Sequence, residues 1–280
     1  RKEKTLIVVH TKELMYQWRE RLLEFTDMKE IGLQGDDNKT IEGVTIGIIN
    51  TLQKSVYNYK DFFGHVIVDE CHRCPSTTFS KFLRRMNTKY MLGLSATPYR
   101  RDGLSQVINF FMGDTIHEIE TKKLQKQGHI MKAKLKVIQT KFNTYVKSVY
   151  DYQKVIKKMV NNDKRNNLIV NKVIKQAEKE KGKGVILVIS DRKNHCEDLF
   201  MLLSDSLFRT FLVDLKHLSS IFLTTPIKYQ GRLIQYIGRI LRKAEGKEKA
   251  TIYDFEDPCW LLKGSFGKRM KTYKEMGIVK

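Results

Sequence analysis

Short apolar runs alternate with helical stretches along the chain, and this alternation constrains the fold more than any other feature of the sequence. Five mostly apolar runs are typical of strands buried on both faces of a sheet: Thr5–Val9, Val44–Ile49, His65–Val68, Tyr90–Leu94 and Gly184–Ile189. After the first of them, Leu14, Trp18, Leu22 and Phe25 recur at the spacing of one helical face. Strands that alternate with helices predict parallel sheets covered by helices, so we predict an α/β fold.

The pattern loosens between about 121 and 152, where lysines are frequent and Lys132–Thr140 alternates as one further strand. We therefore predict a first domain over residues 1–125, a junction over 126–153 and a second domain over 154–280. The second domain has a helical stretch at 154–181, strands at 221–223 and 251–253, and a helix at 230–241 between them. Its basic tail, 263–280, is interpreted as either a closing helix or a frayed end.

Composition indicates an intracellular globular protein that is not secreted and not bound to a membrane. Of 280 residues, 41% are hydrophobic and 30% are charged, as in folded domains. No apolar run approaches the roughly 18 residues of a membrane span, and the N-terminus lacks the pattern of a signal peptide. Four cysteines in a chain of this length predict reduced thiols in the cytoplasm or with the chromosome rather than a disulfide framework.

The charge balance favours a polyanionic partner. Lysine and arginine number 52 against 31 acidic residues, which gives a formal net charge of +21. Nucleic acid is the obvious partner of so basic a surface. An evenly solvated, lysine-rich surface remains the alternative.

The strongest chemical signal is a pair of carboxylates, Asp69 and Glu70, at the end of the third apolar run. Ligands bind at the carboxyl ends of strands in open α/β sheets. One carboxylate can hold Mg²⁺, and the other can orient a water molecule toward a phosphate. A strand end with two solvated acids is the competing interpretation.

Two further segments strengthen the first interpretation. Ser95, Ala96 and Thr97 follow the next strand, and Arg239 and Arg242 lie three residues apart in the second half. That spacing predicts one helical face or turn. The planar guanidinium suits a transferring phosphoryl group because it stays charged and binds two oxygens.

Taken in order, these segments resemble the motifs of superfamily 2 helicases. The matches are motif Ia at Thr5–Trp18, Ib at Thr45–Leu52, II at 69–72 in its Asp-Glu-Cys-His form, III at 95–98, IV at Val185–Ser190 and VI at Gln235–Arg242. The resemblance covers roughly residues 5–257. It extends to the excision-repair helicase of transcription initiation, phage branch-migration helicases and the motor subunits of type I and III restriction enzymes. It implies two RecA-like domains and an ATP-dependent motor on nucleic acid, with double-stranded or branched DNA as the expected partner.

The resemblance also implies roles for single residues. Asp69 would coordinate Mg²⁺, Glu70 would position the attacking water, and Gln235, Arg239 and Arg242 would meet the γ-phosphate of ATP at an interdomain cleft. His72 and the segment Ser95, Ala96 and Thr97 would couple the nucleotide state to strand movement. Four residues would contact the nucleic-acid backbone without reading its sequence: His10, Thr11, Thr51 and Ser190.

This sequence departs from the family pattern in two places. No Gly-x-x-x-x-Gly-Lys-Ser/Thr motif is present, so the first RecA-like domain is expected to lack its phosphate-loop portion, and this chain alone is expected to be inactive. Motif V is not recognisable either, because only 45 positions separate Ser190 from Gln235. Either residues are missing between about 204 and 216, with 35–39 and 143–150 as second choices, or the motif is deleted.

Weaker signals have plainer explanations. Cys71 and Cys74 form a single Cys-x-x-Cys pair, which is half of a tetrahedral zinc site, so we expect no zinc. Trp18 is expected in the core, on the apolar helix face. Two alternatives to a helicase or translocase stay open: the motor of a restriction complex, and a non-catalytic nucleic-acid clamp derived from a helicase.

Overall fold

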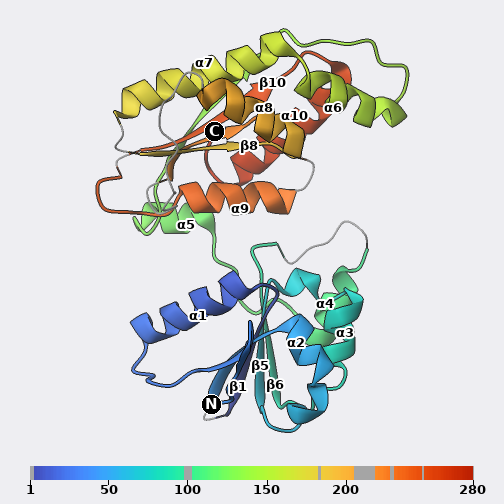
Figure 1. Ribbon diagram of the computed structural model, residues 1–280, viewed down its shortest axis with the longest axis vertical. Helices are drawn as coiled ribbons and strands as arrows, with labels where there is room; N and C mark the ends of the chain where they lie inside the picture. The colour runs from blue at the N-terminus through green and yellow to red at the C-terminus, as the bar shows by residue number, and fades with distance from the viewer. Residues whose placement is uncertain are drawn as a thin grey trace. The chain divides into compact units, whose positions relative to one another are not determined.

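The computed structural model describes residues 3–97, 103–181, 184–204, 218–227, 230–247 and 249–279. The chain divides into two compact units, Arg1–His117 and Glu118–Lys280 (Figure 1). The stretch 126–153, expected as a junction, therefore lies within unit 2. Its strand β7 (Ala133–Gln139) pairs along its whole length with β10 (Ala250–Glu256), which ties it to the second sheet.

Unit 1 is built on a six-stranded sheet with the order β3-β2-β4-β1-β5-β6. Every pairing in it is parallel except that between β2 and β3. The strands are β1 (Thr5–Val9), β2 (Gly32–Gly35), β3 (Asn38–Lys39), β4 (Val44–Ile48), β5 (His65–Asp69) and β6 (Tyr90–Leu94). The four strands predicted in this half are all present, and parallel pairing confirms the α/β fold.

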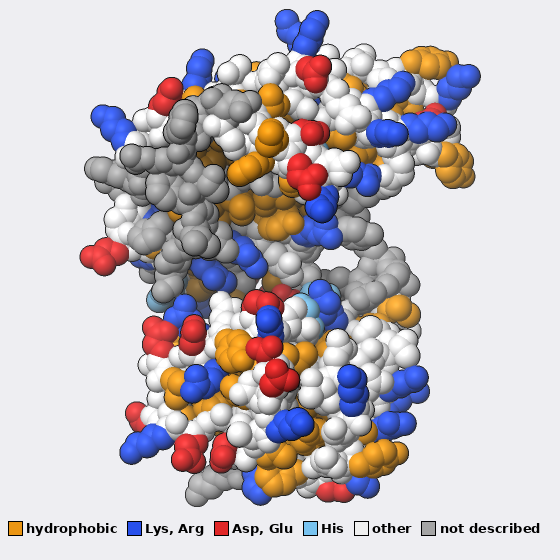
Figure 2. All heavy atoms as spheres, in the orientation of Figure 1, with side chains coloured by type: hydrophobic (Ala, Val, Ile, Leu, Met, Phe, Trp, Pro, Cys, Tyr) orange, Lys and Arg blue, Asp and Glu red, His pale blue; other side chains and the backbone are white. Residues whose placement is uncertain are grey.

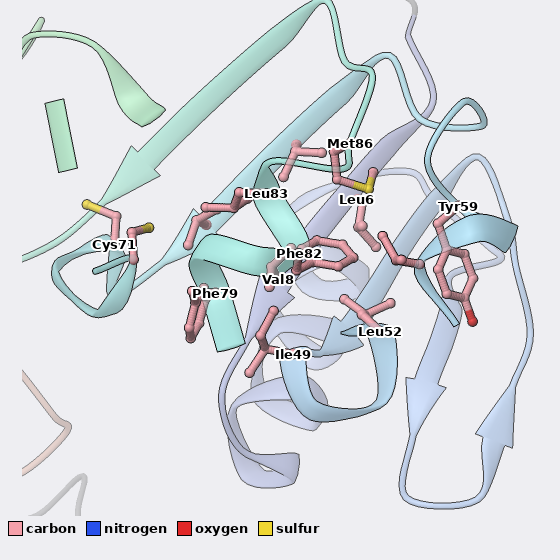
Figure 3. Packing of buried hydrophobic residues seen from close by; sticks show 14 of the residues in the cluster. Leu6, Val8, Ile49, Leu52, Tyr59, Cys71, Phe79, Phe82, Leu83 and Met86 are labelled. Carbon is pink, nitrogen blue, oxygen red and sulfur yellow. The ribbon is translucent and has the colours of Figure 1, made fainter. Parts of the chain in front are cut away.

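Helices cover both faces of this sheet (Figure 1). On one face lies α1 (Lys12–Phe25), whose Met15 is fully buried against Ile7, Val9 and Ile46. The other face carries α2 (Ile49–Lys54), α3 (Thr77–Leu83) and α4 (Ser105–Met112), together with short 3-10 turns at Val56–Asn58 and Cys71–Arg73. Their side chains pack on the strand residues Leu6 and Val8 (Figure 3).

The β2–β3 hairpin was not expected from the sequence. Asp36 and Asp37 both have positive φ angles, of 50° and 66°, as the two central residues of a type I′ turn require. Asn38 Nδ2 donates to the carbonyls of Gly35 and Asp36 and fixes the turn. The break in pattern at 35–39 is therefore a tight hairpin.

Unit 2 is built on a four-stranded, wholly parallel sheet with the order β7-β10-β9-β8, where β8 is Val185–Ile189 and β9 is Leu218–Leu223. Its helices are α5 (Thr121–Lys126), α6 (Tyr152–Val160), α7 (Asp163–Glu180), α8 (Lys193–Ser204), α9 (Gln230–Ile240) and α10 (Trp260–Glu275). A 3-10 turn at Val149–Asp151 leads into α6. Residues 263–275 of the basic tail thus lie in the closing helix α10.

Each face of the second sheet has its own apolar layer. Ile169 and Val173 of α7 and Leu199 of α8 pack against Phe222 and Tyr253 on one face. The other face packs against α9 and α10 through the cluster Leu233, Ile237, Ile240, Tyr273 and Met276. This three-layer arrangement fixes the carboxyl ends of β8 and β9 beside the start of α9.

The helical stretch predicted at 154–181 is two helices rather than one. Asn162 lies between α6 and α7, and its side-chain oxygen accepts a hydrogen bond from the backbone N–H of Arg165. Asparagine is favoured at such an N-cap because it satisfies an otherwise unpaired donor. The interval 204–216, where residues were expected to be missing or motif V deleted, falls almost wholly on residues 205–217, which lie outside the described part of the chain. Within the described part, no helix is both long and apolar enough to span a bilayer.

Candidate active site and nucleic-acid interface

Four neighbouring strands of unit 1 deliver the predicted residues to one edge of its sheet. The strands β4, β1, β5 and β6 are adjacent and parallel, so their carboxyl ends meet at the same edge. His10 and Thr11 follow β1, Glu70 follows β5, Ser95 follows β6, and Thr51 lies in the helix directly after β4. The fold therefore gathers motifs Ia, Ib, II and III of the sequence prediction at a single edge.

Both oxygens of Asp69 are held by donors of unit 1. The indole N–H of Trp18 donates to Oδ2 over 2.8 Å, and the backbone N–H of Glu70 donates to Oδ1 over 2.9 Å. Each carboxylate oxygen has a second lone pair, so one acceptor position on each remains for a hydrated cation. The arrangement fits a Mg²⁺ ion held through one carboxylate and water.

Trp18 was expected in the core, and its ring does pack in the apolar layer around Met15. Its polar edge, however, reaches Asp69, which the sequence prediction missed. The two residues are 51 positions apart, and only the adjacency of β1 and β5 brings them together. An indole N–H that is removed from water needs a partner, and here that partner is the predicted metal-binding carboxylate.

Glu70 adopts a left-handed backbone conformation, with φ of 52° and ψ of 51°. Such a conformation is uncommon for a residue with a side chain and is frequent at functional sites. Here it turns the chain sharply out of β5 into the 3-10 turn that carries His72. Glu70 is half-buried at this turn.

His72 connects motif II to motif III. Its Nδ1 lies 3.2 Å from Glu70 Oε2 and 3.1 Å from Ser95 Oγ, and Ser95 Oγ also accepts a bond from the backbone N–H of Thr97. Since a carboxylate can only accept, a bond from His72 to Glu70 requires the proton on Nδ1. The His72 hydrogen bond holds the pKa of Glu70 below its ordinary value, although burial opposes it, so Glu70 is an ionised acceptor at neutral pH.

His10 lies within the electrostatic reach of the same carboxylates. Burial lowers its pKa, aided by the nearby Arg73, while Glu70 and Asp69 oppose the shift. Its Nδ1 is buried and has no hydrogen-bond partner among the described residues. His10, which was predicted to contact the nucleic-acid backbone, therefore lies near Asp69 and Glu70.

The other residues predicted to contact nucleic acid have structural contacts of their own. Thr11 is the N-cap of α1, and its hydroxyl accepts from the backbone N–H of Leu14. Thr51 is half-buried in α2. Ser190 follows β8 in unit 2, where its hydroxyl bonds His195 and accepts from the N–H of Arg192.

In unit 2 the two predicted arginines share the end of one helix. Arg239 lies in the last turn of α9, and the backbone N–H of Arg242 bonds the Arg239 carbonyl in the turn that follows, as their spacing predicted. Both side chains are exposed, and Gln235 lies half-buried one turn earlier. Lys247 caps this end by donating to the carbonyls of Ile240 and Arg242, and burial lowers its pKa to about 8.

The residues around motif II give no multidentate metal cage. In the described ranges, no three His, Cys, Asp or Glu side chains are grouped to hold an ion. Cys71 and Cys74 lie in the apolar core of unit 1, and burial raises their pKa values to about 11 and 12. At these pKa values both thiols are neutral at pH 7.

On the face of the molecule drawn in Figure 2, basic side chains are dispersed rather than clustered. Figure 2 shows lysine and arginine side chains over the drawn face of both units, with acidic side chains among them. On this face the excess positive charge is thus spread widely, and specific sites must be sought in local clusters.

The first 100 residues match the profile of a family described as the type III restriction enzyme, res subunit. Over most of its length the chain is also similar to helicases. The ATP-dependent DNA helicase uvsW of enterobacteria phage T4 is 26% identical over 96% of this chain and 62% of its own length. The DNA 3'-5' translocase XPB2 of Sulfurisphaera tokodaii is 29% identical over 52% of this chain and 33% of its own length.

The chain thus resembles superfamily 2 helicases, as its motifs predicted. Its fold agrees, since the fragment of an HsdR subunit of a type I restriction enzyme from Vibrio vulnificus superposes with a TM-score of 0.65 at 15% identity, over 91% of this chain and 53% of that one. The helicase domain of Hef from Pyrococcus furiosus gives a TM-score of 0.60 at 10% identity, over 95% of this chain and 89% of that one. At these identities the likeness shows the two RecA-like domains and nothing finer.

The superfamily 2 relatives are longer than this chain. A protein of Acanthamoeba polyphaga mimivirus, named for ATP-dependent RNA helicase activity, is 27% identical over 91% of this chain, which spans 56% of that relative. The alignment with the phage T4 helicase runs over 318 positions, more than the 280 residues present here. Segments within the matched region of that relative are therefore absent from this chain.

Proposed function

We propose that this chain is the motor region of an ATP-dependent helicase or translocase of the Asp-Glu-Cys-His type that acts on DNA. The observation that carries the proposal is the connected group Trp18, Asp69, Glu70, His72 and Ser95 at one edge of the unit 1 sheet. In this group Asp69 is a carboxylate that could hold a hydrated cation, and Glu70 is an ionised acceptor that could orient a water molecule. Phosphoryl transfer from a nucleotide needs both.

In this proposal each residue has a distinct task. Asp69 would hold a Mg²⁺ ion, which would supply neutralisation of the phosphate charge. Glu70 accepts a hydrogen bond from the attacking water and aligns it. Its low pKa keeps it in the accepting, ionised form.

His72 is proposed to transmit the state of the site. Its ring touches Glu70 and Ser95 together, so a movement of Glu70 on loss of the phosphate alters the bond to Ser95. Ser95 in turn fixes the backbone of Thr97. Ser95, Ala96 and Thr97 are in this way the segment through which nucleotide chemistry reaches the nucleic acid.

In unit 2 we assign the phosphate-contacting role to Arg239 and Arg242, with Gln235 in support. Both arginine side chains are exposed at the end of α9, and a guanidinium can bind two phosphate oxygens at once. His10, Thr11, Thr51 and Ser190 are proposed to lie near the nucleic-acid backbone. Thr11 and Ser190, whose hydroxyls already make hydrogen bonds, would contact the nucleic-acid backbone through their backbone amides.

A restriction-complex motor is the second candidate, favoured by the match of residues 1–100 to the restriction-subunit family. It would use the same site and a separate nuclease or methyltransferase partner. The similar helicases carry either DNA or RNA in their names; DNA is proposed here on the names of the phage T4 helicase and the S. tokodaii translocase together with the restriction-subunit match.

The test is nucleotide hydrolysis. The 280-residue chain contains no Gly-x-x-x-x-Gly-Lys-Ser/Thr loop, so alone it should show essentially no ATP hydrolysis stimulated by DNA. In a longer polypeptide that supplies such a loop, Glu70→Gln and Arg239→Ala should each slow hydrolysis by about 10³-fold, as loss of a water-positioning group or an arginine finger does. Glu20→Gln, at an exposed acid of α1, is the matched control and should leave the rate unchanged. A Glu70→Gln rate close to that of the control would remove Glu70 from the site.

A further inference from the structure

A basic cavity of about 460 Å³ lies in unit 2, on the face of the sheet that α7 covers. Its walls include four lysines: Lys136 from the edge strand β7, and Lys172, Lys175 and Lys179 from α7. The three helical lysines are spaced i, i+3 and i+7 and so share one face of the helix. None of the roles proposed above uses this cavity.

None of the four lysines has an ion-pair partner in the described part of unit 2. Among the described residues of unit 2, every ion pair involves other cations, and no carboxylate lies within ion-pair distance of any of the four. The nearby acid Glu180 is engaged by Ser219, Ser220 and Gln176 instead. Four like charges around one cavity repel one another, and an anion placed among them removes that cost.

A buried hydrogen-bond chain positions one of these lysines. Lys136 Nζ donates to the hydroxyl of Tyr253 over 2.8 Å, and the Tyr253 hydroxyl donates to Gln176. Gln176 Nε2 then donates to Ser220 Oγ over 3.0 Å and to Glu180. Since an ammonium has three hydrogens, Lys136 keeps two for a ligand in the cavity.

The floor of the cavity is rigid. Tyr253 is 5% exposed, and its ring stacks on Phe222 with centroids 4.1 Å apart and planes 4° from parallel. One ring face thus packs inside the core, and Lys136 Nζ lies over the ring, 4.8 Å from its centroid, so neither face is open to a base. The cavity offers charge and N–H donors, and no aromatic face for a base.

These features select phosphate groups as the ligand. Lysines are point charges without the planar fork that reads base edges, so they suit phosphates rather than sequence. At 1.5 Å per residue, the row from Lys172 to Lys179 extends about 10 Å along α7. Phosphates of one strand are about 3.4 Å apart along a duplex axis, so the row spans about three of them.

We propose that this cavity binds the phosphodiester backbone of a nucleic-acid strand as it passes over α7 and β7. The proposal rests on the proposed function of the chain in supplying the strand, and it adds a second contact region on unit 2. The site tracks the backbone and has no sequence preference. It increases the number of phosphates neutralised, and therefore the salt dependence of binding.

The first test is a charge-removal pair. One variant carries Lys172→Gln, Lys175→Gln and Lys179→Gln, and the matched control carries the same change at three exposed lysines of α10: Lys263, Lys268 and Lys274. Both lose three charges, and glutamine is a good helix former, so folding is retained. Binding to a labelled single strand is measured over a range of salt concentrations.

Loss of three phosphate contacts should reduce the slope of log affinity against log salt by about 2, at about 0.7 per contact for a single strand. That change in slope corresponds to about 100-fold weaker binding of the cavity variant at 0.1 M salt, and the control should stay within about 2-fold of the unaltered chain. Equal losses in both variants would overturn the proposal, since only net charge would then matter. If the unaltered chain bound no strand at all, the proposed function itself would fail.

The second test locates the contact and distinguishes sources of phosphate. Acetylation of lysines by an amine-reactive ester, read by mass spectrometry, should be slowed by the bound strand at Lys172, Lys175 and Lys179 and unchanged at Lys263 and Lys268. Tripolyphosphate is the competing ligand. If the cavity variant lost tripolyphosphate binding but bound the strand as the control does, the site would serve small polyphosphates and the nucleic-acid proposal would be wrong.

Discussion

His195 makes the stability of unit 2 depend on pH below about 6.5. The ring is fully buried in α8, with Nε2 bonded to Asn166 Oδ1 over 3.0 Å and Nδ1 2.9 Å from Ser190 Oγ. The amide oxygen of Asn166 can only accept, so Nε2 carries the single proton of a neutral ring. Burial, together with the charge of Arg165, lowers the pKa of His195 from 6.5 to about 4.

The direction of the effect follows from that shift. Above pH 6.5 the ring is neutral in both folded and unfolded chains, and nothing is lost. As pH falls from 6.5 toward 4, the unfolded chain takes up a proton that the folded chain refuses, so stability is lost across this window. At pH 5 the two pKa values correspond to a loss of about 2 kcal/mol in the free energy of unfolding.

Urea unfolding at pH 7.5 and pH 5 measures this loss. Trp260 lies at the start of α10 and reports on unit 2 when Trp18→Phe is the common background. The loss of about 2 kcal/mol in the free energy of unfolding at pH 5 should vanish in His195→Gln. It should persist in His129→Gln, which changes an exposed histidine of the same unit and serves as the control. An identical pH dependence in the His195→Gln variant and its parent would refute the reasoning. A ring-proton titration of His195 by NMR near pH 6.5 would contradict it independently.

Two further predictions concern the contacts that hold each unit. Asp257→Asn should destabilise unit 2 by about 3–5 kcal/mol in urea unfolding, because it leaves the buried Arg165 without its charged partner. Asp191→Asn removes the partner of a half-exposed pair and should cost less than about 1 kcal/mol. Equal losses in the two variants would show that burial does not set the difference. Trp18→Phe should cost unit 1 about 2 kcal/mol, as expected for a hydrogen bond to an ionised group, and much less in an Asp69→Asn background. Strict additivity in that double-mutant cycle would mean that the bond contributes nothing.

The sequence predicted the parallel strands well because apolar runs buried on both faces leave a direct signal. The run at 5–9 appears in the structure with the same bounds, and the predicted helical face of Leu14, Trp18, Leu22 and Phe25 lies in α1. The spacing of Arg239 and Arg242 likewise predicted a shared helix end, since that geometry is local.

What the sequence did not predict depends on contacts between distant residues or on single turns. The bond from Trp18 to Asp69 exists only because β1 lies beside β5. The β2–β3 hairpin depends on two aspartates with positive φ, a conformation that the pattern of apolar residues does not encode. The basic cavity was invisible because Lys136 and the lysines of α7 belong to elements that only the fold brings together.

We propose above all that this chain is a motor region that binds the phosphodiester backbone of nucleic acid. The most direct measurement titrates the 280-residue chain with labelled DNA duplexes of unrelated sequence at 50 and 200 mM salt. We predict nearly equal affinities for all sequences and a steep fall with salt, as phosphate contacts dictate. A strong preference for one sequence, or an affinity that does not change with salt, would contradict the account and would indicate a sequence-specific regulator instead.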